Sequence, residues 1–228
     1  MSTIRCAGLG VRRGGREVLR EVSLDLPART IALIGDNGSG KSTLARVLAG
    51  LVRRTGGNLR VLGCDPDHDP AALRATVALV LSNPDAQIMM PTVAEDVALS
   101  LRAARVPRAE RDARVEAALA RFGLDGLGDR PAHDLSGGQK QLLALCGAFV
   151  REPALVIADE PTAFLDGRNA RRVADHLLAD TGHSLVLVTH DLALARRCES
   201  AVLMADGRVA ASGASLDVVD AYEEALAC

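Results

Sequence analysis

The stretch that decides the fold is GDNGSGKST, Gly35 to Thr43. It follows TIALI (30–34), a continuous apolar run of the kind that forms a buried strand. It leads into TLARVLAGL (43–51), where four apolar residues recur at helical spacing: Leu44, Val47, Leu48 and Leu51. A glycine-rich loop between a buried strand and a helix is the context in which the pattern G-x-x-x-x-G-K-Ser/Thr binds phosphate.

The chemistry of this loop follows from its residue types. Glycines let successive backbone N–H groups turn toward phosphate oxygens, and the helix N-terminus adds a positive dipole. We expect Lys41 to reach the β and γ phosphates of a nucleotide, Ser42 to ligate Mg²⁺, and Thr43 to make a further phosphate contact. The residues expected to contact the nucleotide here are Gly35, Asn37, Gly38, Ser39, Gly40, Lys41, Ser42 and Thr43.

A second component follows another buried run, LVIADE (155–160). Its strand ends in Asp159 and Glu160, which places two carboxylates at the edge where open α/β sheets bind ligands. Asp159 would hold Mg²⁺, directly or through water, and Glu160 would accept the proton of an attacking water. An Asp-Glu pair alone is more often a solvated strand end, but beside a phosphate loop it predicts a catalytic site.

The chain alternates strand and helix patterns at both ends. SLVLVT (184–189) is a further short apolar run, and a helix pattern with Ala170, Val173, Ala174 and Leu177 separates it from LVIAD. This alternation predicts a parallel, doubly wound sheet. Asp206-Gly207 lies between two apolar stretches and predicts a hairpin. Ser215 is expected to cap a final helix whose apolar side carries Leu216, Val219, Tyr222 and Leu226.

The middle of the chain, about 83–151, has a helical pattern throughout. Thr92 and Glu95 form a capping-box pattern that opens one helix. Pro107 separates it from a second helix, which Gly123 is placed to end. We expect this section to be a helical insertion into the sheet domain.

Composition excludes several classes of function. The chain has 228 residues, 48% of them hydrophobic, and a net charge of −2, which is typical of a globular protein and gives no electrostatic attraction to nucleic acid. With 2% aromatic residues and no Trp it lacks platforms for stacking bases. Its five cysteines contain no C-x-x-C pair, so zinc and disulfide frameworks are not expected. No run of about 18 apolar residues occurs, so we expect a cytoplasmic chain that does not span a membrane.

LSGGQ, Leu135 to Gln139, predicts a second anion-binding surface. Its serine hydroxyl and glycine amides open a helix pattern. The phosphate loop can already bind the phosphates of one nucleotide by itself. A second anion site in the same chain is therefore best explained if it binds a different nucleotide molecule.

With these motifs the sequence resembles an ATP-binding cassette (ABC) ATPase over nearly its whole length. GDNGSGKST is similar to the Walker A loop, LSGGQ to the signature, LVIADE to Walker B, AFLD (163–166) to the D-loop, and His190 to the switch histidine. The resemblance implies an α/β P-loop NTPase fold with a parallel-sheet core, an N-terminal antiparallel β part and an inserted α-helical subdomain. It implies one domain, 1–228, with a RecA-like core of about 1–82 and 152–228 and a helical subdomain of about 83–151.

The resemblance also implies a head-to-tail dimer that sandwiches two ATP molecules with Mg²⁺. Each nucleotide is then held by one subunit's Walker A loop and the other's signature. Catalysis is assigned to Glu160, Lys41 and His190, the last as a sensor of the γ-phosphate. Further nucleotide contacts are assigned to Ser136, Gly137, Gly138, Gln139 and Asp166.

Two positions depart from the family pattern. Ser82 stands where a Gln usually contacts Mg²⁺ and senses the γ-phosphate; a Ser still ligates Mg²⁺ or binds a water, but its side chain is two carbons shorter. Arg13 stands where an aromatic residue commonly stacks on adenine, and a guanidinium can also stack on a base. We therefore count Ser82 with the metal ligands and Arg13 with the nucleotide contacts.

SNPDAQIMMPTVAEDVALSL (82–101) is similar to the corresponding region of ATPases from energy-coupling-factor importers of vitamins and metals, and QIMMPTV is most like the biotin-transport branch. The implied partners are a second ATPase subunit, a transmembrane coupling subunit and a vitamin-binding membrane subunit, with the chain at the cytoplasmic face of the cell membrane. Gln87, Met89 and Met90 are expected at the outer end of this segment, on a partner surface or buried beneath the helix.

Two alternatives remain open from the sequence. One is a soluble ABC protein that acts on nucleic acid or ribosomes, although such proteins usually carry two cassettes or long basic insertions, which are absent here. The other is a switch that binds ATP without turnover. Glu160 argues against the switch, and Ser82 keeps it open.

Overall fold

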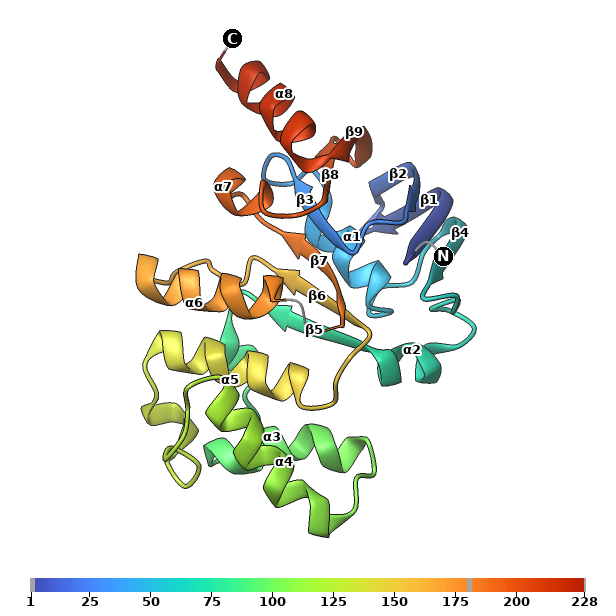
Figure 1. The fold of residues 1–228 in the computed structure, drawn as a ribbon. Helices are drawn as coiled ribbons and strands as arrows, with labels where there is room; N and C mark the ends of the chain where they lie inside the picture. Colours follow the sequence, from blue (N-terminus) through green and yellow to red (C-terminus); the bar gives the residue numbers. More distant parts are fainter. Residues whose placement is uncertain (1–2, 180–181, 228) are drawn as a thin grey trace.

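The computed structural model describes residues 3–179 and 182–227. Among these, a six-stranded sheet has the order β5-β6-β7-β3-β8-β9, in which neighbours are parallel except for the antiparallel pair β8 and β9 (Figure 1). Its strands are β3 (Thr30–Ile34), β5 (Val77–Leu81), β6 (Leu155–Asp159), β7 (Ser184–Val188), β8 (Ser200–Ala205) and β9 (Arg208–Ala214).

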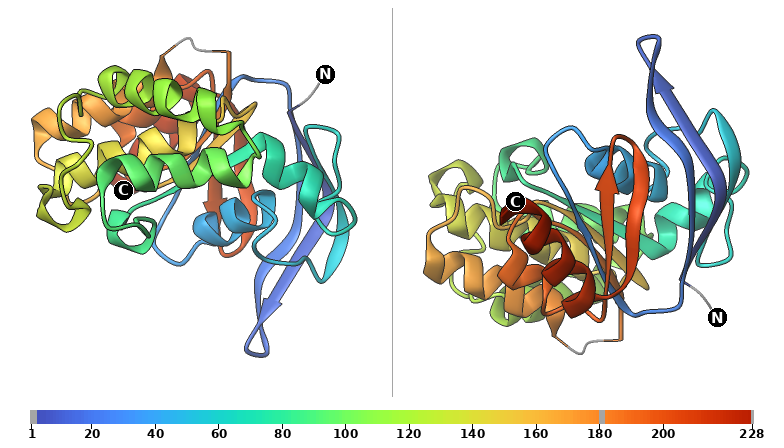
Figure 2. Two further views of the ribbon diagram at one scale, coloured as in Figure 1. Left: turned by 90° about the horizontal axis from the view of Figure 1, so that it is seen from below. Right: turned by 90° about the horizontal axis from the view of Figure 1, so that it is seen from above.

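A second, antiparallel sheet has the order β2-β1-β4. Its strands are β1 (Ile4–Arg13), β2 (Arg16–Leu26) and β4 (Gly56–Val61). The helices are α1 (Lys41–Leu48), α2 (Pro70–Thr76), α3 (Val93–Ala103), α4 (Arg108–Arg121), α5 (Gly137–Phe149), α6 (Gly167–Leu178), α7 (Leu192–Ala195) and α8 (Ser215–Ala227), with 3₁₀ turns at Pro84–Ala86 and Ala132–Asp134. Both views in Figure 2 place the antiparallel sheet on the opposite side of the molecule from the helices between β5 and β6. The predicted fold class is confirmed.

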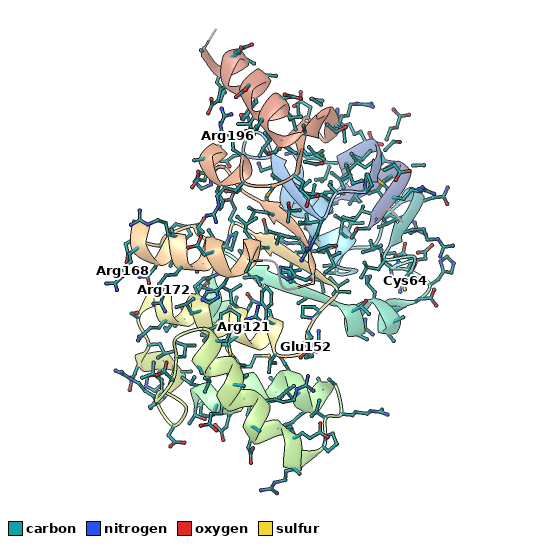
Figure 3. The ribbon with its side chains drawn as sticks, in the orientation of Figure 1. Cys64, Arg121, Glu152, Arg168, Arg172 and Arg196 are labelled. Atoms are coloured by element: carbon teal, nitrogen blue, oxygen red, sulfur yellow. The ribbon has the colours of Figure 1, made fainter. Side chains whose placement is uncertain are left out.

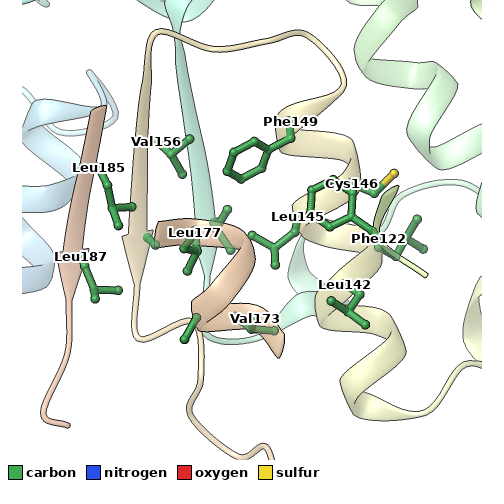
Figure 4. Close-up of a cluster of buried hydrophobic side chains, with 14 of the residues drawn as sticks. Phe122, Leu142, Leu145, Cys146, Phe149, Val156, Val173, Leu177, Leu185 and Leu187 are labelled. Atoms are coloured by element: carbon green, nitrogen blue, oxygen red, sulfur yellow. The ribbon is translucent and has the colours of Figure 1, made fainter. Parts of the chain in front are cut away.

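The parallel strands are apolar except at their ends because both faces of the sheet are covered. Side chains alternate between the faces: in β6, Val156 packs with α5 and α6, while Ile157 packs in the cluster that contains α1 and the antiparallel sheet. Figure 4 shows the first of these clusters, with Phe149 and Leu177 directed at the sheet.

The helical middle section forms as predicted from its caps. Thr92 Oγ1 accepts from Glu95 N at 3.4 Å and Glu95 Oε2 accepts from Thr92 N at 3.2 Å, which is the capping box that opens α3. Gly123, just beyond α4, adopts a positive φ of 66°. Asp206 and Gly207 likewise have φ of 48° and 77°, as a hairpin turn between β8 and β9 requires.

Some predictions of local structure were wrong at helix ends. Leu51 lies beyond α1 and is 62% exposed, so it does not share the buried face. In α8, Leu216 and Leu226 are exposed, and Val218 is buried instead. Ser215 is the first residue of α8, and its hydroxyl donates to the Ala195 carbonyl at 2.7 Å. Of the cysteines, Cys228 lies outside the described residues.

Candidate active site

The parallel sheet brings four segments to one edge. β5, β6, β7 and β3 are consecutive neighbours, so the residues that follow them leave the sheet on the same side. Asp159 pairs with Val188, and Val188 pairs with Leu33, in the strand register. The phosphate loop, Glu160 and His190 therefore start from adjacent strand ends.

The phosphate loop lines a cavity of about 250 Å³. Its lining residues are Val18, Asn37, Gly38, Gly40, Lys41, Ser42, Thr43 and Glu160. Ser39 Oγ is buried and has no hydrogen-bond partner, as expected of a loop shaped around a ligand. Gly35 has φ of 129°, and a Cβ there would lie 2.1 Å from the Met204 carbonyl oxygen, so only glycine fits at the start of the loop.

Lys41 carries the positive charge of this cavity. Its Nζ donates to the backbone oxygens of Gly35 at 2.7 Å and Asp36 at 2.8 Å. Burial lowers the pKa of this amine, and the nearby carboxylates of Glu160, Asp36 and Asp159 oppose that effect. An anionic phosphate in the cavity would act in the same direction as the carboxylates and favour the charged ammonium.

Ser42 and Asp159 offer the oxygen atoms that Mg²⁺ prefers. Ser42 Oγ donates to Asp159 Oδ1 at 2.8 Å, and Asp159 is 6% exposed. Arg46 lies 3.9 Å from the other carboxylate oxygen. Within the described residues no group of three or more His, Cys, Asp or Glu side chains could hold a metal. The pair therefore fits a Mg²⁺ site that is completed by phosphate and water oxygens, as is usual for this ion.

Glu160 and His190 meet at the mouth of the cavity. His190 Nδ1 lies 2.8 Å from Glu160 Oε2, and Glu160 N donates to the Val188 carbonyl at 3.0 Å. Glu160 has a φ of 52°, a conformation that is unfavourable for a non-glycine residue and that clusters at functional sites. The sheet thus aims one carboxylate into the phosphate cavity and pairs it with an imidazole.

Ser82 and Arg13 do not line the cavity. Ser82 follows β5, whose Leu81 pairs with Asp159, so it starts beside the Walker B strand. Arg13 is exposed at the end of β1, whereas Val18 of β2 lines the cavity. The sequence did not predict Val18 as a site residue, because this residue, five positions after Arg13, belongs to no recognisable motif.

The signature residues also lie outside the cavity lining. Ser136 is exposed and caps α5, since its Oγ accepts from Gln139 N and Gln139 Oε1 accepts from Ser136 N. Asp166 caps α6, and hydrogen bonds from Asn169 lower the pKa of its carboxyl. Gly138 packs so closely on Asn169 that an added Cβ would lie 2.4 Å from its side chain.

The segment after β5 is fastened to the sheet and to the signature helix. Gln87 Nε2 donates to the Leu79 carbonyl at 2.9 Å and its Oε1 accepts from Leu81 N at 2.7 Å, so one side chain replaces a neighbouring strand at the sheet edge. Gln87 therefore lies against β5 and not at the outer end of the segment, where we expected it from the sequence. Met89 does lie outside, at 75% exposed.

Two contacts with α5 were not foreseen. The buried Gln141 donates to the Leu81 carbonyl at 3.1 Å, and Lys140 pairs with Asp85 at 2.8 Å. These side chains tie the helix that begins at the signature to the residues on either side of Ser82.

Comparisons with known proteins agree with this geometry. The model of the "ABC transporter" family matches residues 19–163. The chain is 38% identical to "Biotin transport ATP-binding protein BioM" of Rhizobium etli, over 98% of this chain and 99% of that protein.

Solved structures give the same result. The chain superposes with a TM-score of 0.86 and 29% identity on cbiO1 of Clostridium perfringens, described as part of the ABC transporter complex cbiONQ, over 97% of this chain and 92% of that one. It superposes with a TM-score of 0.81 and 25% identity on the ATP-binding cassette MJ0796, solved as a dimer bound to ADP and Pi, over 93% of this chain and 98% of that one.

The phosphate loop, the paired carboxylates at the sheet edge, the signature helix and these matches all lead to one assignment: the chain belongs to the ABC transporter family and is an ATP-binding, ATP-hydrolysing protein of that family.

Proposed function

We propose that this chain is the ATPase of an energy-coupling-factor importer for a vitamin, with biotin as the favoured cargo. The observation that carries the proposal is the similarity to BioM along 98% of the chain. The segment 82–101, where the importer resemblance is strongest, forms the turn and helix that leave the sheet next to the ATP site.

Five side chains would divide the work at the ATP site. Lys41 would bind the β and γ phosphates, while Ser42 and Asp159 would hold Mg²⁺, which neutralises charge on the phosphates when bound. Glu160 would take the proton of the attacking water, and its contact with His190 at 2.8 Å keeps the carboxylate oriented at the cavity mouth.

A second copy would complete the site. The signature residues Ser136 and Gly137 are exposed and outside the cavity of their own chain, so they are free to reach a nucleotide on another copy. Phe164 in the D-loop is 97% exposed with φ of 65°, an unfavourable position for an apolar side chain in water. The dimeric state of MJ0796 supports this arrangement.

A transmembrane coupling subunit would dock beside Met89. A groove of about 220 Å³ lies between the β5 edge, α3 and α5, and its lining includes Leu79, Met89 and Leu99. Flexible methionines suit surfaces that take up a partner helix. We propose that the chain attaches through this groove to the cytoplasmic face of the membrane. No helix in the described part of the chain is long and apolar enough to cross a membrane.

Co-purification tests the proposed function. The tagged chain, expressed with the membrane proteins of its own cell and extracted in detergent, should bring down a transmembrane subunit and a second, vitamin-binding membrane protein. Radiolabelled biotin should remain with the assembly. An ATP-hydrolysing chain that isolates with no membrane protein would contradict the importer assignment, and an assembly that retains a different labelled vitamin would contradict the biotin assignment alone.

The Ser82→Gln substitution tests whether position 82, where related ATPases usually carry a Gln, controls hydrolysis. A Gln is long enough to contact Mg²⁺ directly where Ser acts through a water. Ordering a bridging water costs up to about 2 kcal/mol, which corresponds to at most about a 30-fold change in rate. We expect faster hydrolysis in the isolated chain and a smaller stimulation by the membrane subunits. Ser82→Ala is the matched control, because it removes the hydroxyl without adding reach. Equal rates for all three proteins, with and without the membrane subunits, would show that position 82 is not a control point.

A further inference from the structure

The C-terminal helix α8 reaches the phosphate loop through the side chain of Tyr222. Tyr222 donates its hydroxyl proton to Asp36 Oδ1 at 2.6 Å, across 186 residues of sequence. That length is typical of a hydroxyl on an ionised carboxylate, which is among the stronger hydrogen bonds in proteins. Asp36 lies in the GDNGSGKS loop, yet it is not among the residues that line the phosphate cavity.

The helix that carries Tyr222 is itself held in place. Arg196, just after α7, pairs with Asp220 and with Glu223 at 2.6 Å, and Ser215 Oγ donates to the Ala195 carbonyl at 2.7 Å. Figure 3 shows Arg196 between α7 and the base of α8. Val219 is fully buried under the helix. These contacts hold α8 against the region of α7, so the position of Tyr222 relative to the phosphate loop is well defined.

Asp36 is close enough to Lys41 to act on it. The Asp36 backbone oxygen accepts from Lys41 Nζ at 2.8 Å, and the negative charge of the Asp36 carboxylate favours the charged form of the lysine. The Asp36 carboxylate can therefore pair either with the Tyr222 hydroxyl or with the Lys41 ammonium, and the two pairings have opposite effects on ATP binding. While Tyr222 holds the carboxylate, it stays out of the cavity. If it were released, the carboxylate would compete with the triphosphate for Lys41 and would repel the triphosphate.

We propose that Tyr222 is a positioning residue of the ATPase, which latches the Asp36 carboxylate away from the phosphate site and so keeps Lys41 available for ATP. Hydrogen bonding to Asp36 raises the pKa of Tyr222 to about 12, so the phenol keeps its proton in the neutral range.

A double-mutant cycle separates this role from simple packing of α8. Removing a hydrogen bond to a charged group at a half-exposed position should raise the KM for MgATP about three- to tenfold in Tyr222→Phe, with kcat changed by less than about twofold. The cause would be the released charge, so the same Tyr222→Phe substitution made in an Asp36→Asn protein should change KM by less than about twofold. Equilibrium ATP binding should give the same pattern without turnover.

A structural role gives a different result. If Tyr222 only anchors α8, Tyr222→Phe lowers the melting temperature and leaves KM unchanged, or changes KM equally in both backgrounds; either outcome overturns the proposal.

A spectroscopic signal reports the latch independently of activity. Tyr222 is the only tyrosine of the chain, which has no Trp, so ultraviolet emission comes from this residue. A phenol hydrogen-bonded to a carboxylate emits weakly, so Asp36→Asn should brighten the emission. Unchanged emission would show that the two side chains are not in contact in solution and would also overturn the proposal.

Discussion

The Glu160→Gln protein should bind MgATP and fail to hydrolyse it. Glutamine has nearly the same shape as Glu160 and can keep a hydrogen bond to His190, which lies 2.8 Å away. It cannot accept a proton from water, and loss of a general base costs about 10²- to 10⁴-fold in rate. Single-turnover hydrolysis of labelled ATP measures the loss, and equilibrium dialysis measures the retained binding.

Two control variants show whether the loss of hydrolysis in the Glu160→Gln protein is due to the missing base. Glu116→Gln, an exposed residue of α4, removes the same charge far from the cavity and should hydrolyse at the rate of the unmodified chain. Lys41→Ala should instead lose ATP binding, because Lys41 is the buried cation of the phosphate cavity. A Glu160→Gln protein that turns over ATP like the Glu116→Gln control would show that Glu160 is not the base.

The Ser136→Arg protein should be nearly as inactive, although Ser136 does not line the phosphate cavity of its own chain. In a head-to-tail dimer Ser136 would face the nucleotide of the other copy, where an Arg side chain would occupy the place of the γ-phosphate contact. We expect at least about a 10²-fold loss of hydrolysis, the scale of losing one donor to a reacting oxyanion. ATP binding to the isolated chain should persist, since Lys41 and its loop are untouched; loss of this binding would contradict the dimer assignment.

The sheet and its site were largely predictable because their signals are local. TIALI and LVIAD match β3 and β6 to the residue, since a strand covered on both faces is apolar at nearly every position. The phosphate loop is likewise a contiguous motif. By contrast the sequence predicted no residue ranges for β1, β4 and α2. The register of β1 against β2 shifts between Cys6 and Leu9 and again between Leu9 and Val11, and β4 buries only Leu59 and Val61.

The contacts between distant segments could not be predicted from the sequence. Glu160 and His190 are 30 residues apart, and Asp36 and Tyr222 are 186 apart. Tyr222 looked like one apolar residue of an amphipathic helix, and nothing in the local pattern shows that its hydroxyl reaches the phosphate loop. Gln87 was misread for a similar reason: its two backbone contacts exist only because β5 is the edge of the sheet.

Mixing two inactive proteins tests directly whether ATP is hydrolysed between two copies of this chain. In a mixed dimer of Ser136→Arg and Lys41→Ala chains, one site combines the intact Lys41 loop with the intact signature. With random pairing half of the dimers are mixed, so hydrolysis should return to about a quarter of the unmodified rate. A chain that carries both substitutions, mixed with either single variant, assembles no intact site and should recover nothing. Failure of the Ser136→Arg and Lys41→Ala mixture to recover hydrolysis, when mixed dimers are shown to form, would contradict the composite site.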